Sequence, residues 1–352
     1  MKPLQIINDI HIGVKRSAGT TPNSAAALRK YILDSFAKLL PADKDVLILG
    51  DLFDEFVVDI VDFWETFSIL SAWLSIHGNH LTLVRGNHDW SPKASAKSSF
   101  DLLADLLLHV YDRVTVVRDG VMDIGNGVVV VPHVANQDCF ELELDRAVAM
   151  GGIYLLTHCN LIPPACHGRH DHSLTIDEDR AIVLSKQLVI LNAHEHQHIT
   201  YDLGKGIHCL GNQIPSSIAD CLSKGRHQQD GIKYVTVIEP DMGLSKIPVW
   251  DAFGEFAIVD WRDVESAPDV QFIRVSGSAK AEEAALVVDA IAKLRSTSSA
   301  FVISNAVQVE GQEGIEEAAA ATYESIKVFD VMSALLGELE PAERKVIEEV
   351  MQ

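Results

Sequence analysis

The sequence predicts an α/β protein. Its 352 residues exceed the roughly 150 of one average domain, so about two domains are expected. Within the first 90 residues, short apolar runs alternate with helix-like stretches in β-α-β-α-β order, which is typical of parallel sheets. A separate strand, helix, strand pattern begins after residue 267. Hydrophobic residues make up 47% and charged residues 22%, and no apolar run reaches about 18 residues. Disordered and membrane-spanning chains are therefore excluded.

The N-terminal elements are each bounded by recognisable stop signals. Pro41 cannot continue a helix, and Gly78 is the residue type favoured just past a helix end. The expected elements are a strand over 2–7, a helix over 24–40, a strand over 45–49, a helix over 59–76 and a strand over 81–84.

The middle of the chain continues this alternation and then changes character. Helices are expected over 99–109 and 137–150, and strands over 114–118, 127–131, 153–156 and 188–191. From 199 to 248, short strands are separated by Gly and Pro with no helix between them. This pattern predicts a second layer of largely antiparallel sheet.

The C-terminal part predicts a small cap domain and a helical tail. Strands over 271–275 and 300–307 flank a helix over 279–295, and an acidic, Ala-rich linker then leads to amphipathic helices over 323–336 and 341–351. So short a helix pair cannot bury its apolar stripes alone and must dock on something. The predicted domains are 1–260, a cap over 261–312 and a C-terminal helical segment over 313–352.

Five apolar strands are each followed by residues that can bind a metal ion. Because the carboxyl ends of parallel strands meet at one edge of a sheet, these residues should converge. They are Asp9 and His11 in DIH, Asp51 in GDLFD, Asn87, His88 and Asp89 in GNHD, His158 after IYLLT, and His194 and His196 in HEH.

The donor types indicate which ions would bind. Carboxylates, an amide and imidazoles without thiolates suit Mn²⁺, Fe²⁺ or Zn²⁺ better than an all-oxygen Mg²⁺ or Ca²⁺ site. Seven candidate ligands exceed what one ion with open positions needs, so two divalent ions are expected. Asp51 is the expected bridging ligand, because Gly50 before it allows a tight turn.

These motifs resemble those of the calcineurin-like metallophosphoesterases, DxH, GDxxD, GNH[DE], H and GHxH, with Ala193 in place of the last motif's glycine. Within this family, DIHIG, GDLFDEF and GNHD are most similar to the SbcD-like DNA repair nucleases. The resemblance covers residues 1–250. It implies a four-layer sandwich of two central mixed sheets flanked by helices, with the cap binding DNA. One metal would be held by Asp9, His11, Asp51 and His196, and the other by Asp51, Asn87, His158 and His194.

The same resemblance assigns the remaining site residues and the activity. His88 would act on the leaving oxygen of the scissile phosphate, with Asp89 orienting it, and Asp54 and Arg85 are candidate substrate-binding residues, Asp54 in a supporting role. The implied activity is a Mn²⁺-dependent DNA nuclease in repair or recombination, an exonuclease that also has endonuclease activity. Mg²⁺, Fe²⁺ or Zn²⁺ could replace Mn²⁺.

The alternatives are a small-molecule or nucleotide phosphodiesterase and a phosphoprotein phosphatase. Arg85 in RGNH resembles the phosphatases, but these carry an arginine directly after GDxxD, where this chain has Glu55. An acidic side chain repels a phosphate dianion, which disfavours a monoesterase. A non-catalytic scaffold is a third class, and the complete ligand set argues against it.

Charge and cysteine content bear on partners and compartment. The net charge of −21 opposes nucleic-acid binding unless bound cations reverse it locally, so DNA binding should depend on the metals, local Lys and Arg, and a partner. The resemblance implies a coiled-coil ATPase of the SbcC type, gripped by the C-terminal helices; the alternative is that they dock on their own core or a second copy. A homodimer is also expected. Five cysteines without a CxxC pair, and an N-terminus unlike a secretion signal, favour the cytoplasm.

Two further segments of the chain are rich in histidine. HGNH over 77–80 mimics the GNHD motif but ends a helix, so we expect it to be structural. The loop CHGRHDHS, with His167, His170 and His172, is expected to be solvated, since its spacing matches no zinc rule closely.

Overall fold

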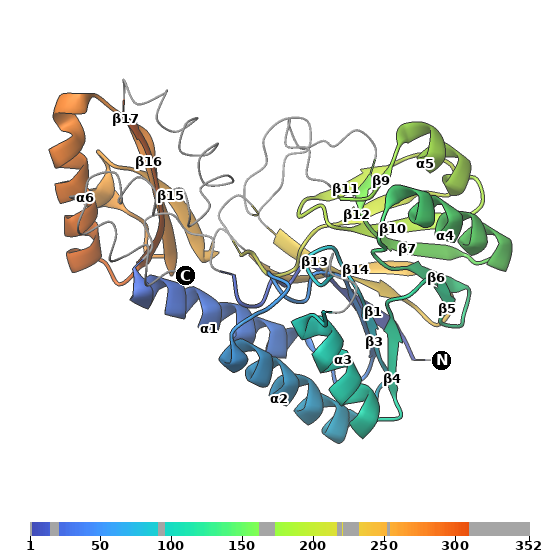
Figure 1. Cartoon of the computed structure of the whole chain (residues 1–352). Helices are drawn as coiled ribbons and strands as arrows, with labels where there is room; N and C mark the ends of the chain where they lie inside the picture. The colour runs from blue at the N-terminus through green and yellow to red at the C-terminus, as the bar shows by residue number, and fades with distance from the viewer. Residues whose placement is uncertain are drawn as a thin grey trace, which may run out of the picture. The chain divides into compact units, whose positions relative to one another are not determined.

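The computed structural model describes residues 2–14, 21–90, 96–161, 173–216, 220, 232–251 and 254–309 (Figure 1). The chain divides into two compact units. The first comprises Met1–Ile258, Pro268–Arg274 and Ser298–Asn305; the second comprises Val259–Ala267, Val275–Thr297 and Ala306–Gln352. Among the described residues, no helix has the length and apolar character needed to cross a membrane.

The first sheet contains six strands in the order β14-β13-β1-β2-β3-β4. The three strands predicted from the N-terminal alternation, and the next one predicted over 114–118, pair in parallel, as expected of the alternation. They are β1 (Leu4–Ile7), β2 (Asp45–Leu49), β3 (Leu81–Val84) and β4 (Val114–Val117). At one edge, β13 (Ile232–Ile238) and β14 (Leu244–Asp251) add antiparallel strands, with Gln5 opposite Val237.

The second sheet also has six strands, in the order β11-β12-β10-β7-β6-β5. Its central strands are parallel and its outer pairs are antiparallel. The strands are β5 (Met122–Asp123), β6 (Val128–Val131), β7 (Tyr154–His158), β10 (Val189–Ala193), β11 (His198–Tyr201) and β12 (Ile207–Leu210). A separate sheet of two short parallel strands, β8 (Asn160–Leu161) and β9 (Thr175–Ile176), comes between β7 and β10 along the chain.

Two mixed sheets confirm the predicted fold class, but one prediction about their assembly is wrong. Residues 199–248 do not form an antiparallel layer of their own, because β11 and β12 extend the second sheet whereas β13 and β14 extend the first. The pairings of these strands are nevertheless largely antiparallel, as expected, and β12 is the exception because it pairs in parallel with β10. Strand patterns alone do not encode which edge a strand joins.

Alternating side chains build the four layers (Figure 1). Leu47 and Leu49 of β2 face the second sheet, where they share a buried cluster with Leu156 and Leu191. The intervening Val46 and Ile48 face the other way, toward the helices. The helices on the first sheet are α1 (Pro22–Leu39), α2 (Ile60–His77) and α3 (Ser99–Val110).

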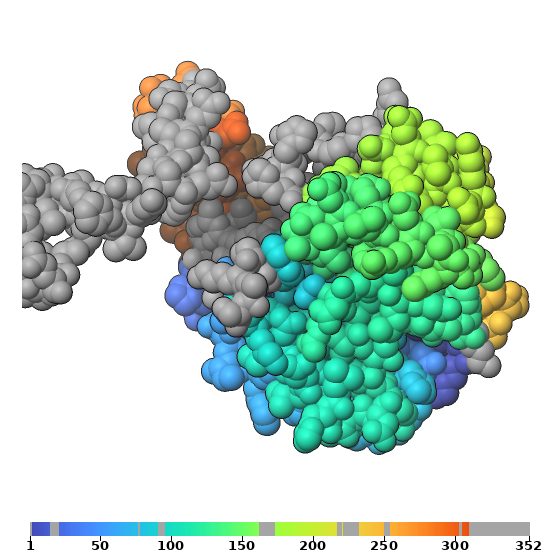
Figure 2. All heavy atoms as spheres, turned by 45° about the vertical axis from the view of Figure 1, so that its right-hand side comes forward, coloured from blue at the N-terminus to red at the C-terminus, as the bar shows by residue number. Residues whose placement is uncertain are grey.

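The outer face of the second sheet is covered by α4 (Gln137–Met150) and α5 (Glu178–Ser185). Figure 2 shows these two helices side by side at the surface, in green and yellow-green. Helix starts are set by caps: Ser98 and Asp101 form a capping box on α3, and Asn136 accepts from the Cys139 amide at the start of α4.

A third sheet, in the order β15-β16-β17, contains the strand, helix, strand pattern expected of the cap. Its strands are β15 (Phe256–Asp260), β16 (Phe272–Ala279) and β17 (Phe301–Val309), and α6 (Ala284–Thr297) buries Val287, Ile291 and Leu294. The predicted boundaries at 260 and 312 stay predictions. The segment 313–352, with the helices expected over 323–336 and 341–351, lies outside the described residues, as does the loop with His167, His170 and His172.

Gly50, at the end of β2, gives a test of how tightly the two sheets meet. A Cβ atom there would lie 2.2 Å from Nδ1 of His158, and the residue has a φ of +76°. We expect Gly50→Ala to lower the free energy of unfolding by about 2–4 kcal/mol, from backbone strain plus overpacking. Gly125→Ala is the matched control, because its φ is +93° but its Cβ would meet nothing within 4 Å.

Urea unfolding of both variants separates the two contributions. The control should lose only about 1 kcal/mol, the cost of the left-handed backbone. Equal losses in the two variants would show that the contact with His158 is unimportant.

Candidate metal centre

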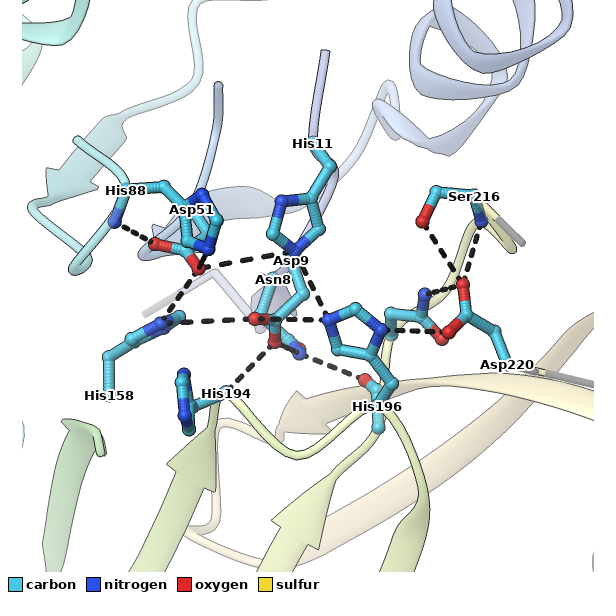
Figure 3. A network of polar contacts seen from close by, with 12 residues as sticks. Asn8, Asp9, His11, Asp51, His88, His158, His194, His196, Ser216 and Asp220 are labelled. Atoms are coloured by element: carbon cyan, nitrogen blue, oxygen red, sulfur yellow. Dashed lines mark hydrogen bonds and ion pairs between the residues drawn. The ribbon is translucent and has the colours of Figure 1, made fainter. Parts of the chain in front are cut away.

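The predicted ligands converge where the carboxyl edges of the two sheets meet (Figure 3). Asp9, Asp51 and Asn87 follow β1, β2 and β3 of the first sheet, whereas His158 and His194 come from β7 and β10 of the second. Three overlapping groups have potential ligand atoms within 4.8 Å of one another: Asp9 with His11 and His196; His11 with Asp51 and His88; Asp51 with His158 and His194.

The backbone that presents these ligands is strained. Asp9, His11, Asp51 and His194 have φ values of 51°, 53°, 47° and 81°, a region that side chains other than glycine rarely adopt. The loops after β1 and β2 hold one another in place, since the amides of Ile10 and His11 both donate to the Asp51 carbonyl at 3.0 and 3.1 Å. Such strain persists only where surrounding contacts enforce it, and it clusters at functional sites.

The first ion position is defined by Asp9, His11 and His196. Nε2 of His11 lies 3.1 Å from Nε2 of His196, so the two imidazoles present nitrogen lone pairs to one place. Oδ1 of Asp9 is fully buried and accepts no hydrogen bond from the described residues, while its Oδ2 accepts from Asn8 and the His194 amide. A buried carboxylate oxygen without a donor is costly unless a cation neutralises it. These residues therefore fit a bound divalent ion.

The second ion position is defined by Asp51, Asn87, His158 and His194. Nε2 of His158 lies 3.2 Å from Oδ2 of Asp51 and 2.9 Å from Oδ1 of Asn87, which is also 3.1 Å from Nδ1 of His194. Nδ1 of His158 lies 3.1 Å from the Leu49 carbonyl and can donate to it, which leaves Nε2 for the site. Asp51 also belongs to the group with His11, as a bridging ligand would.

The electrostatic field of this region favours cations. Burial lowers the pKa of His158, but the carboxylates of Asp51 and Asp9 outweigh it and raise that pKa to about 10. Asp51 is 1% exposed, and its pKa is held well below its usual value by His158, His11 and His88 although burial acts in the opposite direction. Two buried carboxylates thus concentrate negative charge at the point where the imidazoles meet.

His88, the predicted catalytic residue, lies at the edge of the site. Its amide donates to Oδ1 of Asp51 at 3.0 Å, and its Nδ1 contacts the backbone carbonyl of Asp54. The imidazole is 27% exposed, more than those of His11 and His158. It is therefore oriented by a main-chain carbonyl and accessible to a substrate.

Asp89 has a different role from the one predicted. Its carboxylate accepts from the amides of Gly86 at 3.0 Å, Phe53 at 3.2 Å and Leu52 at 3.4 Å, so it fastens the GNHD loop to the GDLFD loop. Burial and the neighbouring Asp51 raise its pKa to about 7. The contact that orients His88 comes from Asp54 instead.

The two candidate substrate-binding residues lie in different surroundings. Asp54 is 3% exposed, and its Oδ1 is 3.1 Å from Nδ1 of His11, so it is placed to orient that ligand, in the supporting role expected. The guanidinium of Arg85 donates to the His133 carbonyl at 3.3 and 3.4 Å. A role of Arg85 in substrate binding stays a prediction.

Asn79, in the HGNH segment, is structural as expected. It is fully buried, and its amide group donates to the carbonyls of Pro41 and Ala42, which closes the turn before β3.

A buried polar network that the sequence does not predict lies behind His196 (Figure 3). Oδ1 of Asp220 lies 2.8 Å from Nδ1 of His196, and its Oδ2 accepts from the amide and hydroxyl of Ser216 at 2.9 and 3.1 Å. Lys233, which is 4% exposed in β13, donates to the Asp220 carbonyl at 2.6 Å and to Asn212 at 2.9 Å. Nothing in the sequence near Asp220 indicated its role.

Charge in this network supports His196 as a ligand. Burial raises the pKa of Asp220, but His196 and Lys233 outweigh it and hold that pKa far below its usual value. A permanent carboxylate on Nδ1 fixes the imidazole so that Nε2 faces His11 and Asp9.

Asp220→Ala tests this assignment. Without the carboxylate the imidazole of His196 can rotate, so we expect Mn²⁺ affinity at one of two sites to fall about 10- to 100-fold. Isothermal titration calorimetry measures the change, with Asp202→Ala, at an exposed position after β11, as control. Unchanged affinity at both sites would refute the role of Asp220.

The comparisons with known proteins agree with this geometry. The family model described as calcineurin-like phosphoesterase matches residues 3–198. No curated protein matches the chain.

Two solved structures are similar at low identity. One, described as a protein of unknown function from Aquifex aeolicus, is 15% identical with a TM-score of 0.28, covering 50% of this chain and 88% of that one. The other, a dimetal phosphatase from Danio rerio, is 11% identical with a TM-score of 0.38, covering 70% and 95%. TM-scores this low carry no argument. Because the family model spans more than half of the sequence, and its fold and a complete donor set are present, this chain belongs to the calcineurin-like phosphoesterases, metal-dependent hydrolases of phosphoesters.

Proposed function

We propose that this chain is a Mn²⁺-dependent DNA nuclease of the SbcD-like type, an exonuclease that also cuts internally, acting in repair or recombination. The observation that carries the proposal is the exposed Glu55 next to Asp54, whose carbonyl contacts His88. A carboxylate adjacent in sequence to the residue that contacts His88 would repel the dianion of a phosphomonoester more strongly than the monoanion of a phosphodiester. The site therefore favours diester substrates.

The residues supply distinct functions in such a hydrolysis. Two divalent ions, when bound, would activate water and neutralise the charge on the phosphate. His88, held by the Asp54 carbonyl and exposed at the edge, would donate a proton to the leaving oxygen. Asp89 keeps His88 and Asp51 on adjoining loops through its three backbone contacts.

Manganese is the proposed ion because the donors mix four imidazoles with two carboxylates and an amide. The ligands to which this applies are Asp9, His11, Asp51, Asn87, His158, His194 and His196. The same donors accept Fe²⁺ or Zn²⁺, and Mg²⁺ less readily.

A phosphatase or a nucleotide phosphodiesterase is the second candidate, and Arg85 near the site favours it. One comparison separates the candidates: digestion of linear duplex DNA against hydrolysis of p-nitrophenyl phosphate, both with Mn²⁺. We expect the DNA to be degraded and the monoester to be spared. The reverse result would establish a monoesterase.

His88→Ala tests whether His88 is a proton donor or a metal ligand, because His88 also forms a group of potential ligands with His11 and Asp51. A proton donor should be dispensable for metal binding, so we expect about 10²- to 10⁴-fold slower cleavage with both ions retained. Metal content and cleavage rate are measured together, with the exposed His109→Ala as control. Loss of an ion in the variant would make His88 a ligand.

We propose that an SbcC-type coiled-coil ATPase is the partner and that the enzyme works as a homodimer in the cytoplasm. The support is the family resemblance and the net charge of −21, which makes binding to DNA dependent on a partner.

Truncation after Gly314 tests the partner proposal. We expect Mn²⁺-dependent cleavage to persist and association with the ATPase in a pull-down to be lost, because the apolar positions of 323–336 and 341–351 are removed. Full-strength association of the truncated chain would contradict the proposal.

A further inference from the structure

A third histidine follows the second sheet at the edge that holds the metal centre. Val131 of β6 pairs with Thr157 of β7, and Ala193 of β10 pairs with His158 of β7. The parallel strands β6, β7 and β10 are neighbours in this sheet (Figure 1). His133, His158 and His194 lie at or just after their carboxyl ends. The run VVVVPH obeys the same strand-end rule as the ligands.

The imidazole of His133 is buried, and its Nδ1 has no hydrogen-bond partner among the described residues. The residue is 7% exposed, and Nδ1 is fully buried. Its backbone is firmly held, since its amide donates to the Arg85 carbonyl at 2.9 Å and its carbonyl accepts from the Arg85 guanidinium. An unsatisfied buried polar group costs about 1–3 kcal/mol, which a bound ligand can offset.

The surroundings of His133 keep its imidazole uncharged at neutral pH. Burial, reinforced by the positive charges of His158 and Arg85, lowers its pKa to about 4. At neutral pH the ring thus offers one neutral donor and one acceptor.

Trp90 lies against this imidazole. It directly follows GNHD, its amide donates to the Asn87 carbonyl at 3.4 Å, and its ring centroid is 5.5 Å from that of His133 at an interplanar angle of 58°. The indole is partly exposed. An aromatic surface is therefore fixed one residue beyond the loop that carries Asn87 and His88, and the imidazole of His133 lies against it.

We propose that Trp90 and His133 form a subsite that binds the nucleoside next to the scissile phosphate, by stacking on the indole and hydrogen bonding to the imidazole. The inference rests on the proposed phosphodiesterase function. A phosphate group is the less suitable occupant, because the Arg85 guanidinium is engaged by the His133 carbonyl and His133 carries no charge. Nucleobases stack on aromatic side chains with a loss of about 1–3 kcal/mol when the side chain is removed.

Two chromogenic diesters with the same leaving group test the subsite. Thymidine 5′-(p-nitrophenyl phosphate) carries a nucleoside, whereas methyl p-nitrophenyl phosphate carries none. We expect the full chain with Mn²⁺ to prefer the thymidine ester in kcat/KM, and Trp90→Ala to lower that preference about ten-fold or more, mainly through KM. His133→Phe keeps a ring against Trp90 but removes both nitrogens, so it should also lower the preference. Trp64→Ala, at an exposed tryptophan of α2, is the control and should leave it unchanged.

A binding measurement accompanies the kinetics. Without metal, thymidine should quench the intrinsic fluorescence of the unaltered chain and of Trp64→Ala, and the quenching should disappear in Trp90→Ala.

The outcomes distinguish this inference from the nuclease proposal. If the unaltered chain does not cut duplex DNA but prefers the thymidine ester through Trp90, the subsite stands and the nuclease proposal fails. If the chain cuts DNA but Trp90→Ala and His133→Phe keep the full preference, the subsite is wrong. Equal use of the two esters by the unaltered chain also overturns the subsite.

Discussion

Two buried carboxylates determine the design of this molecule. Asp9 is fully buried and Asp51 is 1% exposed, and both lie where the two sheets meet. Charges removed from water are tolerated only with close counter-charges and hydrogen bonds. The imidazoles of His11, His158 and His196 surround the carboxylates, and divalent ions would complete the neutralisation. The donor set that the family motifs supply is thus the set that the two buried charges require.

The backbone geometry that brings these groups together raises the conformational free energy of the residues that carry them. Left-handed backbone at Asp9, His11, Asp51 and His194 costs about 1–3 kcal/mol per residue. The four layers supply the compensation, because the helices and both sheets bury three continuous apolar clusters around the strands that carry the strain. Glycine removes the remaining conflict: a Cβ on Gly86 would lie 2.3 Å from the Asp51 amide nitrogen. The site is therefore rigid because the loops interlock.

The sequence predicted the parallel core and all seven candidate ligands from a local rule, since each ligand follows an apolar strand. It did not predict which sheet each strand joins, because β11 to β14 have similar patterns yet divide between two edges. The residues that support His196 were also not predicted. Asp220 contacts His196 across 24 positions, and Lys233 lies near the start of β13, where a lysine signals nothing by itself. His133 was missed although it obeys the rule, because its motif belongs to no family pattern.

The charge of the site would also allow an acidic chain to act on a polyanion, as the proposed function requires. The whole protein carries −21, yet two dications against the carboxylates of Asp9 and Asp51 would leave the centre locally positive. Asp220 does not reverse this balance, because Lys233 lies against it and matches its charge. Attraction of a phosphate is thus confined to the reach of the ions, about a Debye length of 10 Å in ordinary salt. Beyond that distance the surface repels nucleic acid, so affinity must come from contacts made next to the scissile bond, such as uncharged aromatic ones, or from a partner that binds the strand elsewhere.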